Sequence, residues 1–228
     1  MLKELCARVC AANQELARAG LALQTWGNAS AYDPASGFVV IKPSGVAYEA
    51  LRPDDMVIVD LEGHPARAGL APSVDLPTHL AIYRAFEGVG GVVHTHSHFA
   101  VCWAQARRAI PCLGTTHADY FHGDVPVTRA LTEAEMADYE AGTGRAIVEA
   151  FWDRDPLTTP ALLAAGHAPF TWGASVEKAL EHAIVLEEVA RMAFHTVSLN
   201  ADAIALEEHV LKKHHERKHG AGAYYGQR

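Results

Sequence analysis

Two histidines one residue apart end an apolar segment that has the pattern of a β-strand. The segment, residues 90–96, reads Gly-Gly-Val-Val-His-Thr-His. Because side chains two positions apart in a strand lie on the same face, we expect His94 and His96 to point the same way. Two neighbouring neutral imidazoles supply half of a tetrahedral zinc site. The alternative is a strand end with two solvated histidines, so the pair alone does not establish a metal site.

Four loop segments combine small polar residues with glycine or proline. They are residues 25–30, 41–45, 72–75 and 114–120. Hydroxyl groups, glycine amides, Asn28 and Lys42 are the donors and the cation that a phosphate monoester requires. None of these segments is a Walker-type loop or a GxGxxG motif, so a nucleotide is not indicated. The competing interpretation of each segment is ordinary turn chemistry, in which the same residue types dominate.

Two aspartates are candidates for a catalytic carboxylate. Asp75 precedes an expected helix over residues 76–86, so it is either the N-cap of that helix or a site residue. Asp119 is followed by aromatic residues, and an apolar environment would raise its pKa towards a range useful for acid/base catalysis. The alternative for Asp119 is a helix-start residue. His79 and His98 fall on expected helices, which favours surface or packing roles.

Composition excludes several classes of protein. The formal net charge of −8 lacks the basic field of a nucleic-acid binder. Most of the basic residues within 212–219 are interpreted as the solvated last turns of a helix. Four cysteines without a CxxC pair indicate a reducing compartment. No signal-type apolar segment follows the N-terminus, and no run approaches the ~18 apolar residues of a membrane span, so we expect a cytoplasmic protein.

Expected strands and helices alternate along the chain without repeats or an obvious linker. Helices are expected at residues 2–16, 76–86, 97–107, 132–151, 175–197 and 201–218, and strands at 37–42, 55–60, 90–96 and 161–165. Such interleaving predicts one α/β domain.

Seven segments resemble the class II aldolase/epimerase family. In chain order they are TWGNAS (25–30), VIKPSGV (40–46), DLPTH (75–79), GGVVHTHS (90–97), GTTHADYF (114–121), IVLEEVA (184–190) and RKHGAGAYYGQ (217–227). The resemblance covers nearly the whole chain, and the THADYF and YYGQ segments are similar to the family's epimerases. It implies one domain over residues 1–228, with a three-layer α/β/α fold around a mixed, largely antiparallel sheet. It also implies that the tail, residues 217–228, contributes to the active site.

The resemblance implies a catalytic Zn²⁺ held by His94, His96 and His167, although Mn²⁺ or Co²⁺ occupies similar sites. Asp75 falls where aldolase relatives carry a glutamate near the metal. Residues matching the family's phosphate-binding positions are Asn28, Lys42, Ser44, Gly45 and Ser73.

Asp119 and Tyr225 match the family's acid/base pair. In the family this pair reaches the metal of a neighbouring subunit in a cyclic homotetramer. The implied reaction interconverts L-ribulose 5-phosphate and D-xylulose 5-phosphate by breaking and re-forming the C3–C4 bond. The alternatives are a class II aldolase that releases its aldehyde and a non-catalytic sugar-phosphate-binding homologue.

Two residues depart from the family's pattern. Val74 stands where the family usually has a second serine before the aspartate, and it cannot donate a hydroxyl hydrogen bond. Ala168 replaces the usual glycine after His167, which adds a methyl group beside the metal position. The first departure bears on the identity of the substrate more than on the type of reaction.

Overall fold

A six-stranded sheet forms the middle layer of the protein. The structure is a computed structural model that describes residues 2–224, so Tyr225 lies outside the described residues. The strands follow the order β3-β2-β1-β4-β6-β5 across the sheet. Their bounds are β1 (Asn28–Asp33), β2 (Phe38–Ile41), β3 (Val57–Asp60), β4 (Gly91–His94), β5 (Ala161–Leu163) and β6 (Pro169–Gly173). Every pairing between these strands is antiparallel, and an isolated parallel bridge joins Val127 to Leu163.

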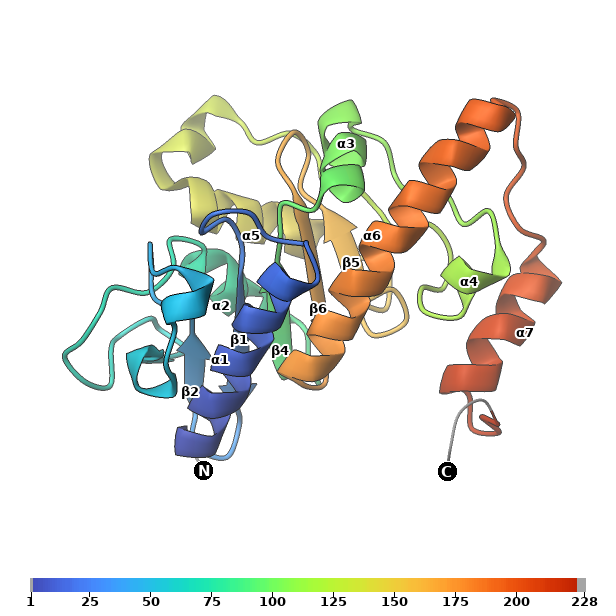
Figure 1. Ribbon diagram of the computed structural model, residues 1–228. Helices are drawn as coiled ribbons and strands as arrows, with labels where there is room; N and C mark the ends of the chain where they lie inside the picture. The colour runs from blue at the N-terminus through green and yellow to red at the C-terminus, as the bar shows by residue number, and fades with distance from the viewer. Residues whose placement is uncertain (1, 225–228) are drawn as a thin grey trace.

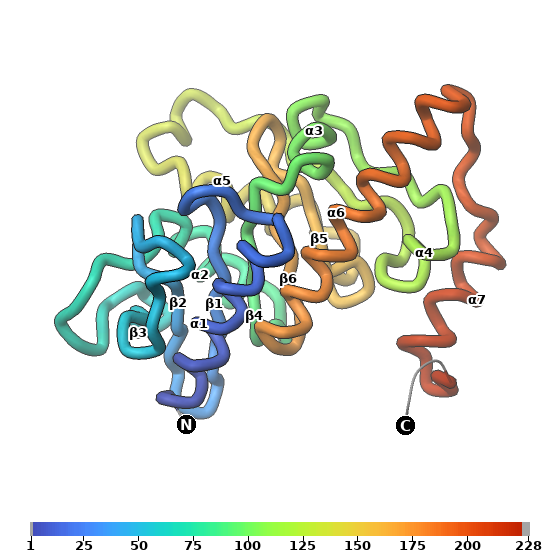
Figure 2. The backbone as a smooth tube through the Cα atoms, in the orientation of Figure 1, coloured from blue at the N-terminus to red at the C-terminus, as the bar shows by residue number. Residues whose placement is uncertain are grey.

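Helices cover both faces of the sheet, which confirms the three-layer fold (Figures 1 and 2). Strand alternation directs Val40 and Val93 to the face that packs against α1 (Leu2–Arg18) and α6 (Val176–Leu199). The neighbouring apolar side chains of β2 and β4 face α2 (Leu76–Ala85) and α5 (Tyr139–Glu149). Burial of both faces stabilises the sheet through the hydrophobic effect.

A third apolar cluster joins α3 (His98–Ala106) and the C-terminal half of α6 to residues 110–127. Beyond it, α4 (Thr115–Ala118) lies beside α7 (Glu208–His219) at one end of the molecule (Figure 1). The described residues also contain three short 3₁₀ helices, which are η1 (Tyr48–Ala50), η2 (Pro53–Asp55) and η3 (Glu133–Asp138). No helix within residues 2–224 has the length and apolar character needed to cross a membrane.

Several element boundaries differ from those expected from sequence. β1 and β6 were not predicted; β1 carries buried polar residues and therefore lacks an apolar strand pattern. The expected helix over 132–151 is divided, because η3 starts at a Thr132–Glu135 capping box and Asp138 leaves helical geometry before α5 begins. The closing helix starts at Glu208 instead of residue 201.

The antiparallel order brings four chain segments to one edge of the sheet. β1 and β6 begin there, whereas β2 and β4 end there, since each is antiparallel to its neighbour. Asn28, the first residue of β1, pairs directly with His94, the last residue of β4. The residues that follow β2 and precede β6 reach the same edge, and these are the segments that carry Lys42 and His167.

Candidate metal centre

Three histidines converge at this edge of the sheet. His94 ends β4, His96 lies two residues beyond it, and His167 lies in the turn between β5 and β6. Their candidate ligand atoms all lie within 4.8 Å of one another. The Nε2 atoms of His94 and His96 are 3.2 Å apart. Two ligands of a tetrahedral zinc ion with Zn–N bonds of ~2.0–2.1 Å would be separated by ~3.3 Å, so the pair is already at a suitable spacing.

The orientation of His94 is fixed by contacts with β6. Its Nδ1–H donates to the carbonyl oxygen of Pro169 at 3.0 Å, and its ring stacks on Phe170 with centroids 4.3 Å apart. A hydrogen bond from Nδ1 leaves the lone pair on Nε2, the atom that faces His96. His94 is therefore held in the tautomer that binds a metal through Nε2.

His96 and His167 are held neutral by their surroundings. Burial, together with the charge of His94, lowers the pKa of each imidazole to about 4. Neutral imidazole is the form that binds metals. The Nδ1 atom of His167 is also buried without a hydrogen-bond partner in the described residues. Three convergent imidazoles fit Zn²⁺, and they also fit Mn²⁺ or Co²⁺.

Asp75 directs its carboxylate into the site instead of capping α2. It occupies the N-cap position but makes no side-chain cap hydrogen bond. Its Oδ2 atom accepts hydrogen bonds from Asn28 Nδ2 at 2.6 Å and Ser73 Oγ at 3.3 Å. Burial raises the pKa of Asp75, but the charges of His94 and His79 and the Asn28 donor outweigh it and leave the pKa lowered. The carboxylate is therefore ionised beside the histidines.

One cavity of about 360 Å³ contains the metal centre and the expected phosphate-binding residues. The predicted residues that line it are Asn28, Lys42, Ser44, Gly45, Ser73, Asp75, His94, His96 and His167. Val74 also lines it, with 65% of its surface exposed. The four loop segments of the sequence analysis therefore differ: residues from the first three line this cavity, whereas none from 114–120 does.

Lys42 is a buried cation at the end of β2. It is 2% exposed; its Nζ donates to the carbonyl oxygen of Pro43 at 3.2 Å and lies 5.0 Å from the centroid of the Tyr48 ring. No salt bridge to Lys42 is present within residues 2–224. Burial lowers its pKa. A buried ammonium group that faces a cavity without a carboxylate partner is suited to bind an anion.

Gly27 allows the 25–28 loop to pass close to β4. Its φ angle of +93° lies in the region that favours glycine, and a Cβ atom there would be 2.7 Å from the carbonyl oxygen of His94. A side chain at this position would displace either the loop or the histidine strand.

Asp119 does not line this cavity. Its carboxylate accepts two hydrogen bonds from Arg217, at 2.9 and 2.5 Å, and one from His214 at 3.1 Å. The expectation of a raised pKa was wrong: burial raises it, but the bonds from Arg217 and His214 outweigh burial and leave the pKa of Asp119 lowered. The interpretation of the basic cluster as a solvated helix end was also wrong for these two residues and for Lys218, whose Nζ lies 3.8 Å from the Tyr120 ring centroid.

His79 is fully buried, so the packing interpretation holds and the surface one does not. Its Nδ1 lies 2.7 Å from Ser30 Oγ, which also contacts the Tyr83 hydroxyl at 2.7 Å.

Two further residues, Tyr139 and Glu140, line the cavity and were not singled out from the sequence. The Thr132–Glu135 capping box was the available signal for a short helix that ends just before them.

Comparison with known proteins agrees with this architecture. Residues 7–194 match the family model described as the class II aldolase and adducin N-terminal domain. The L-ribulose-5-phosphate 4-epimerase UlaF of Salmonella paratyphi C is 50% identical over 228 residues, which is all of both chains. An L-fuculose 1-phosphate aldolase structure superposes with a TM-score of 0.80 at 20% identity, covering 94% of this chain and 95% of that one. The L-fuculose-1-phosphate aldolase of Thermus thermophilus gives a TM-score of 0.66 at 27% identity, with 89% and 98% covered. The chain belongs to the class II aldolase and adducin N-terminal domain family.

Proposed function

We propose that this protein is a metal-dependent epimerase that interconverts L-ribulose 5-phosphate and D-xylulose 5-phosphate. The observation that carries the proposal is that the three-histidine cluster and the buried Lys42 line one cavity. A substrate with a phosphate at one end and a ketose at the other matches such a cavity. The name and full-length coverage of the 50% identical relatives support this choice of substrate.

The phosphate end of the substrate is assigned to Lys42 and the loops beside it. Lys42 supplies the positive charge, Ser44 and Ser73 supply hydroxyl donors, and Gly45 lets the backbone approach closely. Holding the phosphate keeps the cleaved fragment in the site while its aldehyde group turns over. Retention of the fragment is what separates an epimerase from an aldolase that uses the same bond cleavage.

The ketose end is assigned to the histidine cluster. Inversion at C4 cannot start from deprotonation, because C4 is not adjacent to the C2 carbonyl, whereas cleavage of the C3–C4 bond allows it. A divalent ion held by His94, His96 and His167 would act as a Lewis acid on the oxygens at C2 and C3. Asp75 remains ionised beside it and is positioned by Asn28 to accept a hydrogen bond from a substrate hydroxyl.

The two proton-transfer groups are assigned to Asp119 and Tyr225 of a neighbouring subunit in a homotetramer. Asp119 does not line the cavity of its own chain, so in this assignment its carboxylate serves the metal centre of another copy. Arg217 and His214 orient the Asp119 carboxylate and keep it ionised, the form that a proton acceptor requires, although the same bonds reduce its basicity. The tail, residues 217–228, would thereby belong to the same site. We place the enzyme in the cytoplasm, which agrees with its free cysteines.

Kinetic assays of the zinc-loaded protein test the proposal. We expect conversion of L-ribulose 5-phosphate to D-xylulose 5-phosphate and a much lower kcat/KM for unphosphorylated L-ribulose. Lys42→Met should retain metal and lose most of this preference for the phosphate. Net release of glycolaldehyde phosphate would favour the aldolase alternative, and binding without turnover in zinc-replete protein would favour a non-catalytic homologue.

A further inference from the structure

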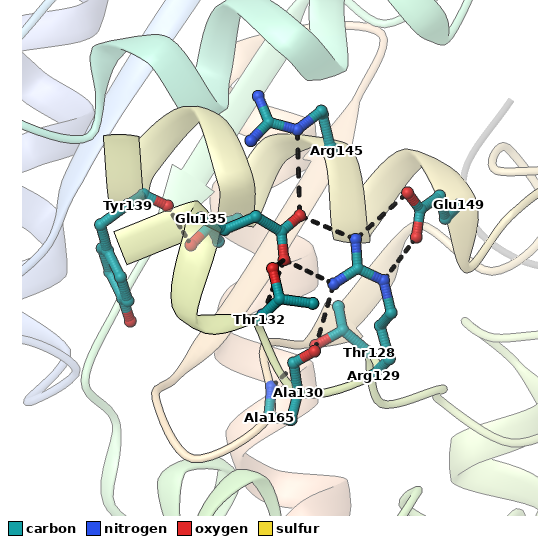
Figure 3. A network of polar contacts seen from close by, with 10 residues as sticks. Thr128, Arg129, Ala130, Thr132, Glu135, Tyr139, Arg145, Glu149 and Ala165 are labelled. Carbon is teal, nitrogen blue, oxygen red and sulfur yellow. Dashed lines mark hydrogen bonds and ion pairs between the residues drawn. The ribbon is translucent and has the colours of Figure 1, made fainter. Parts of the chain in front are cut away.

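Arg129 is the centre of an ion-pair network that joins the segment before η3 to α5 (Figure 3). Its guanidinium donates to both carboxylate oxygens of Glu135, at 2.8 Å each, and to both of Glu149, at 2.7 and 3.2 Å. The remaining N–H donates to the carbonyl oxygen of Ala130 at 3.1 Å. All five N–H donors are thus used, in a planar arrangement that a lysine could not reproduce.

One side of this network leads to His167. Thr128 is the residue before Arg129. Its hydroxyl oxygen accepts a hydrogen bond from the backbone N–H of Ala165 at 2.9 Å, and the backbone N–H of Thr128 donates to the carbonyl oxygen of Leu163. Ala165 is two residues before His167. The segment that carries Arg129 is therefore attached to the turn that positions the third histidine.

The other side leads to Tyr139. Glu135 accepts hydrogen bonds from the backbone N–H and the hydroxyl of Thr132, closing the first turn of η3, which runs directly into Tyr139. A Cβ atom on Gly142 would lie 3.0 Å from the Cβ atom of Glu135, so α5 packs closely over this turn. Glu149, at the far end of α5, is held by the same guanidinium. The start of α5 is therefore fixed relative to the His167 turn.

The consequence is a tyrosine ring beside a metal ligand. The ring centroids of Tyr139 and His167 are 5.8 Å apart, and both residues line the cavity of about 360 Å³. In Figure 3 the phenol ring of Tyr139 points away from the Arg129 network. The phenol group can donate a hydrogen bond to a ligand in the cavity. Exposed ion pairs add little to the free energy of unfolding, so we look for the role of the Arg129 network in positioning this ring.

We propose that Tyr139 is a substrate-binding residue that donates a hydrogen bond to an oxygen atom of the ligand held at the three-histidine site. Arg129 is then a positioning residue, because it fixes Tyr139 and His167 relative to each other through Glu135 and Thr128. The identity of the substrate rests on the proposed function, but the role of Tyr139 towards a ligand at this centre does not depend on epimerisation.

Calorimetry with glycolohydroxamate, a bidentate oxygen ligand for divalent metals, tests the role of Tyr139 directly. Tyr139→Phe removes the hydroxyl and keeps the ring. We expect its zinc content and Tm to match the parent protein, while the Kd for glycolohydroxamate rises ~10- to 150-fold, as expected for loss of a hydrogen bond to a charged group. A Kd within twofold of the parent value would overturn the assignment, as would loss of zinc from this variant.

Variants of Arg129 test the positioning role. Arg129→Met should raise the Kd several-fold, and Arg129→Lys should give an intermediate value because it restores charge but not both bidentate contacts. In the Tyr139→Phe background, Arg129→Met should change the Kd less than twofold, since both residues act through one hydrogen bond. Fully additive effects would show that Arg129 acts by another route.

Arg8→Met is the matched control. Arg8 also makes a bidentate contact, to Glu177 at 2.7 Å on each oxygen, but it joins α1 to α6 away from the cavity. We expect Arg8→Met to leave the Kd unchanged; an effect equal to that of Arg129→Met would contradict a specific role for Arg129. If the parent protein binds glycolohydroxamate but does not convert L-ribulose 5-phosphate, the proposed reaction fails, and the binding ratios alone decide the role of Tyr139.

Discussion

Asn28 Nδ2 donates a 2.6 Å hydrogen bond to Asp75 Oδ2, joining the first residue of β1 to the residue before α2. This bond diverts the Asp75 carboxylate from the end of its own helix into the cavity. Asn28 also donates to Ser73 Oγ at 3.0 Å, so one amide group orders two candidate substrate-binding side chains. A strand residue therefore organises the loop that faces the histidine cluster.

Removal of one histidine should abolish metal binding. His96→Ala leaves two imidazoles of the three that converge within 4.8 Å, and two are too few for a stable zinc site. We expect less than stoichiometric zinc by elemental analysis after purification and near-complete loss of activity. His98→Ala, in a neighbouring exposed position, is the control and should keep its zinc. A His96→Ala protein with one zinc per chain would disprove the assignment.

The metal-free protein should lose stability as pH falls from about 7 to 4. The folded-state pKa values of His96 and His167 are lowered to about 4, so the folded chain binds fewer protons than the unfolded chain, in which histidine titrates near ~6.5. Stability is therefore greatest above the unfolded pKa and decreases through this window. Thermal melts of metal-free protein at several pH values measure it. A Tm that stays constant or rises between pH 7 and pH 5 would contradict the burial of neutral histidines; His96→Ala should show a shallower decrease.

A shared active site predicts complementation between two inactive variants. His96→Ala disables the metal centre, and Tyr225→Phe disables the proposed proton-transfer group that a neighbouring subunit supplies. Mixed tetramers assembled after co-refolding would contain some interfaces at which both halves are intact. We expect partial recovery of kcat in the mixture and none in either variant alone. Mass spectrometry must verify mixing, and mixed tetramers without recovered activity would refute the shared site.

Val74 should limit the affinity for the substrate's phosphate. It lines the cavity beside Ser73 and is largely exposed, so a serine hydroxyl at this position could reach the phosphate without repacking the core. A water molecule or a backbone amide can replace part of the missing contact, which reduces the expected gain. We expect Val74→Ser to lower the KM for L-ribulose 5-phosphate ~3- to 10-fold with kcat nearly unchanged, and Val74→Ala to leave the KM close to that of the parent. Loss of activity towards the phosphorylated sugar in Val74→Ser would assign Val74 to a different substrate pocket.

Local patterns predicted some features well and others poorly. The convergence of His94 and His96 followed from their spacing, even though only His94 lies in the strand. The place of His167 came from family resemblance, since no local spacing connects it with a partner 73 positions earlier. The predicted pKa shift of Asp119 was in the wrong direction. Arg217, which keeps the carboxylate ionised, is 98 residues away in the sequence, so no local pattern indicates the contact. Tyr139 was missed because residues 132–151 were interpreted as one continuous helix, which concealed the break between η3 and α5.

NMR of the reaction in D₂O tests the central claim most directly. Zinc-loaded protein and ¹³C-labelled L-ribulose 5-phosphate would be followed until the two ketoses reach equilibrium. Cleavage and re-formation of the C3–C4 bond leave the hydrogens on both carbons in place. We predict D-xylulose 5-phosphate without deuterium at C3 or C4 and without accumulation of glycolaldehyde phosphate. Deuterium at either carbon, steady accumulation of the aldehyde, or no conversion by protein with a full complement of zinc would contradict the claim.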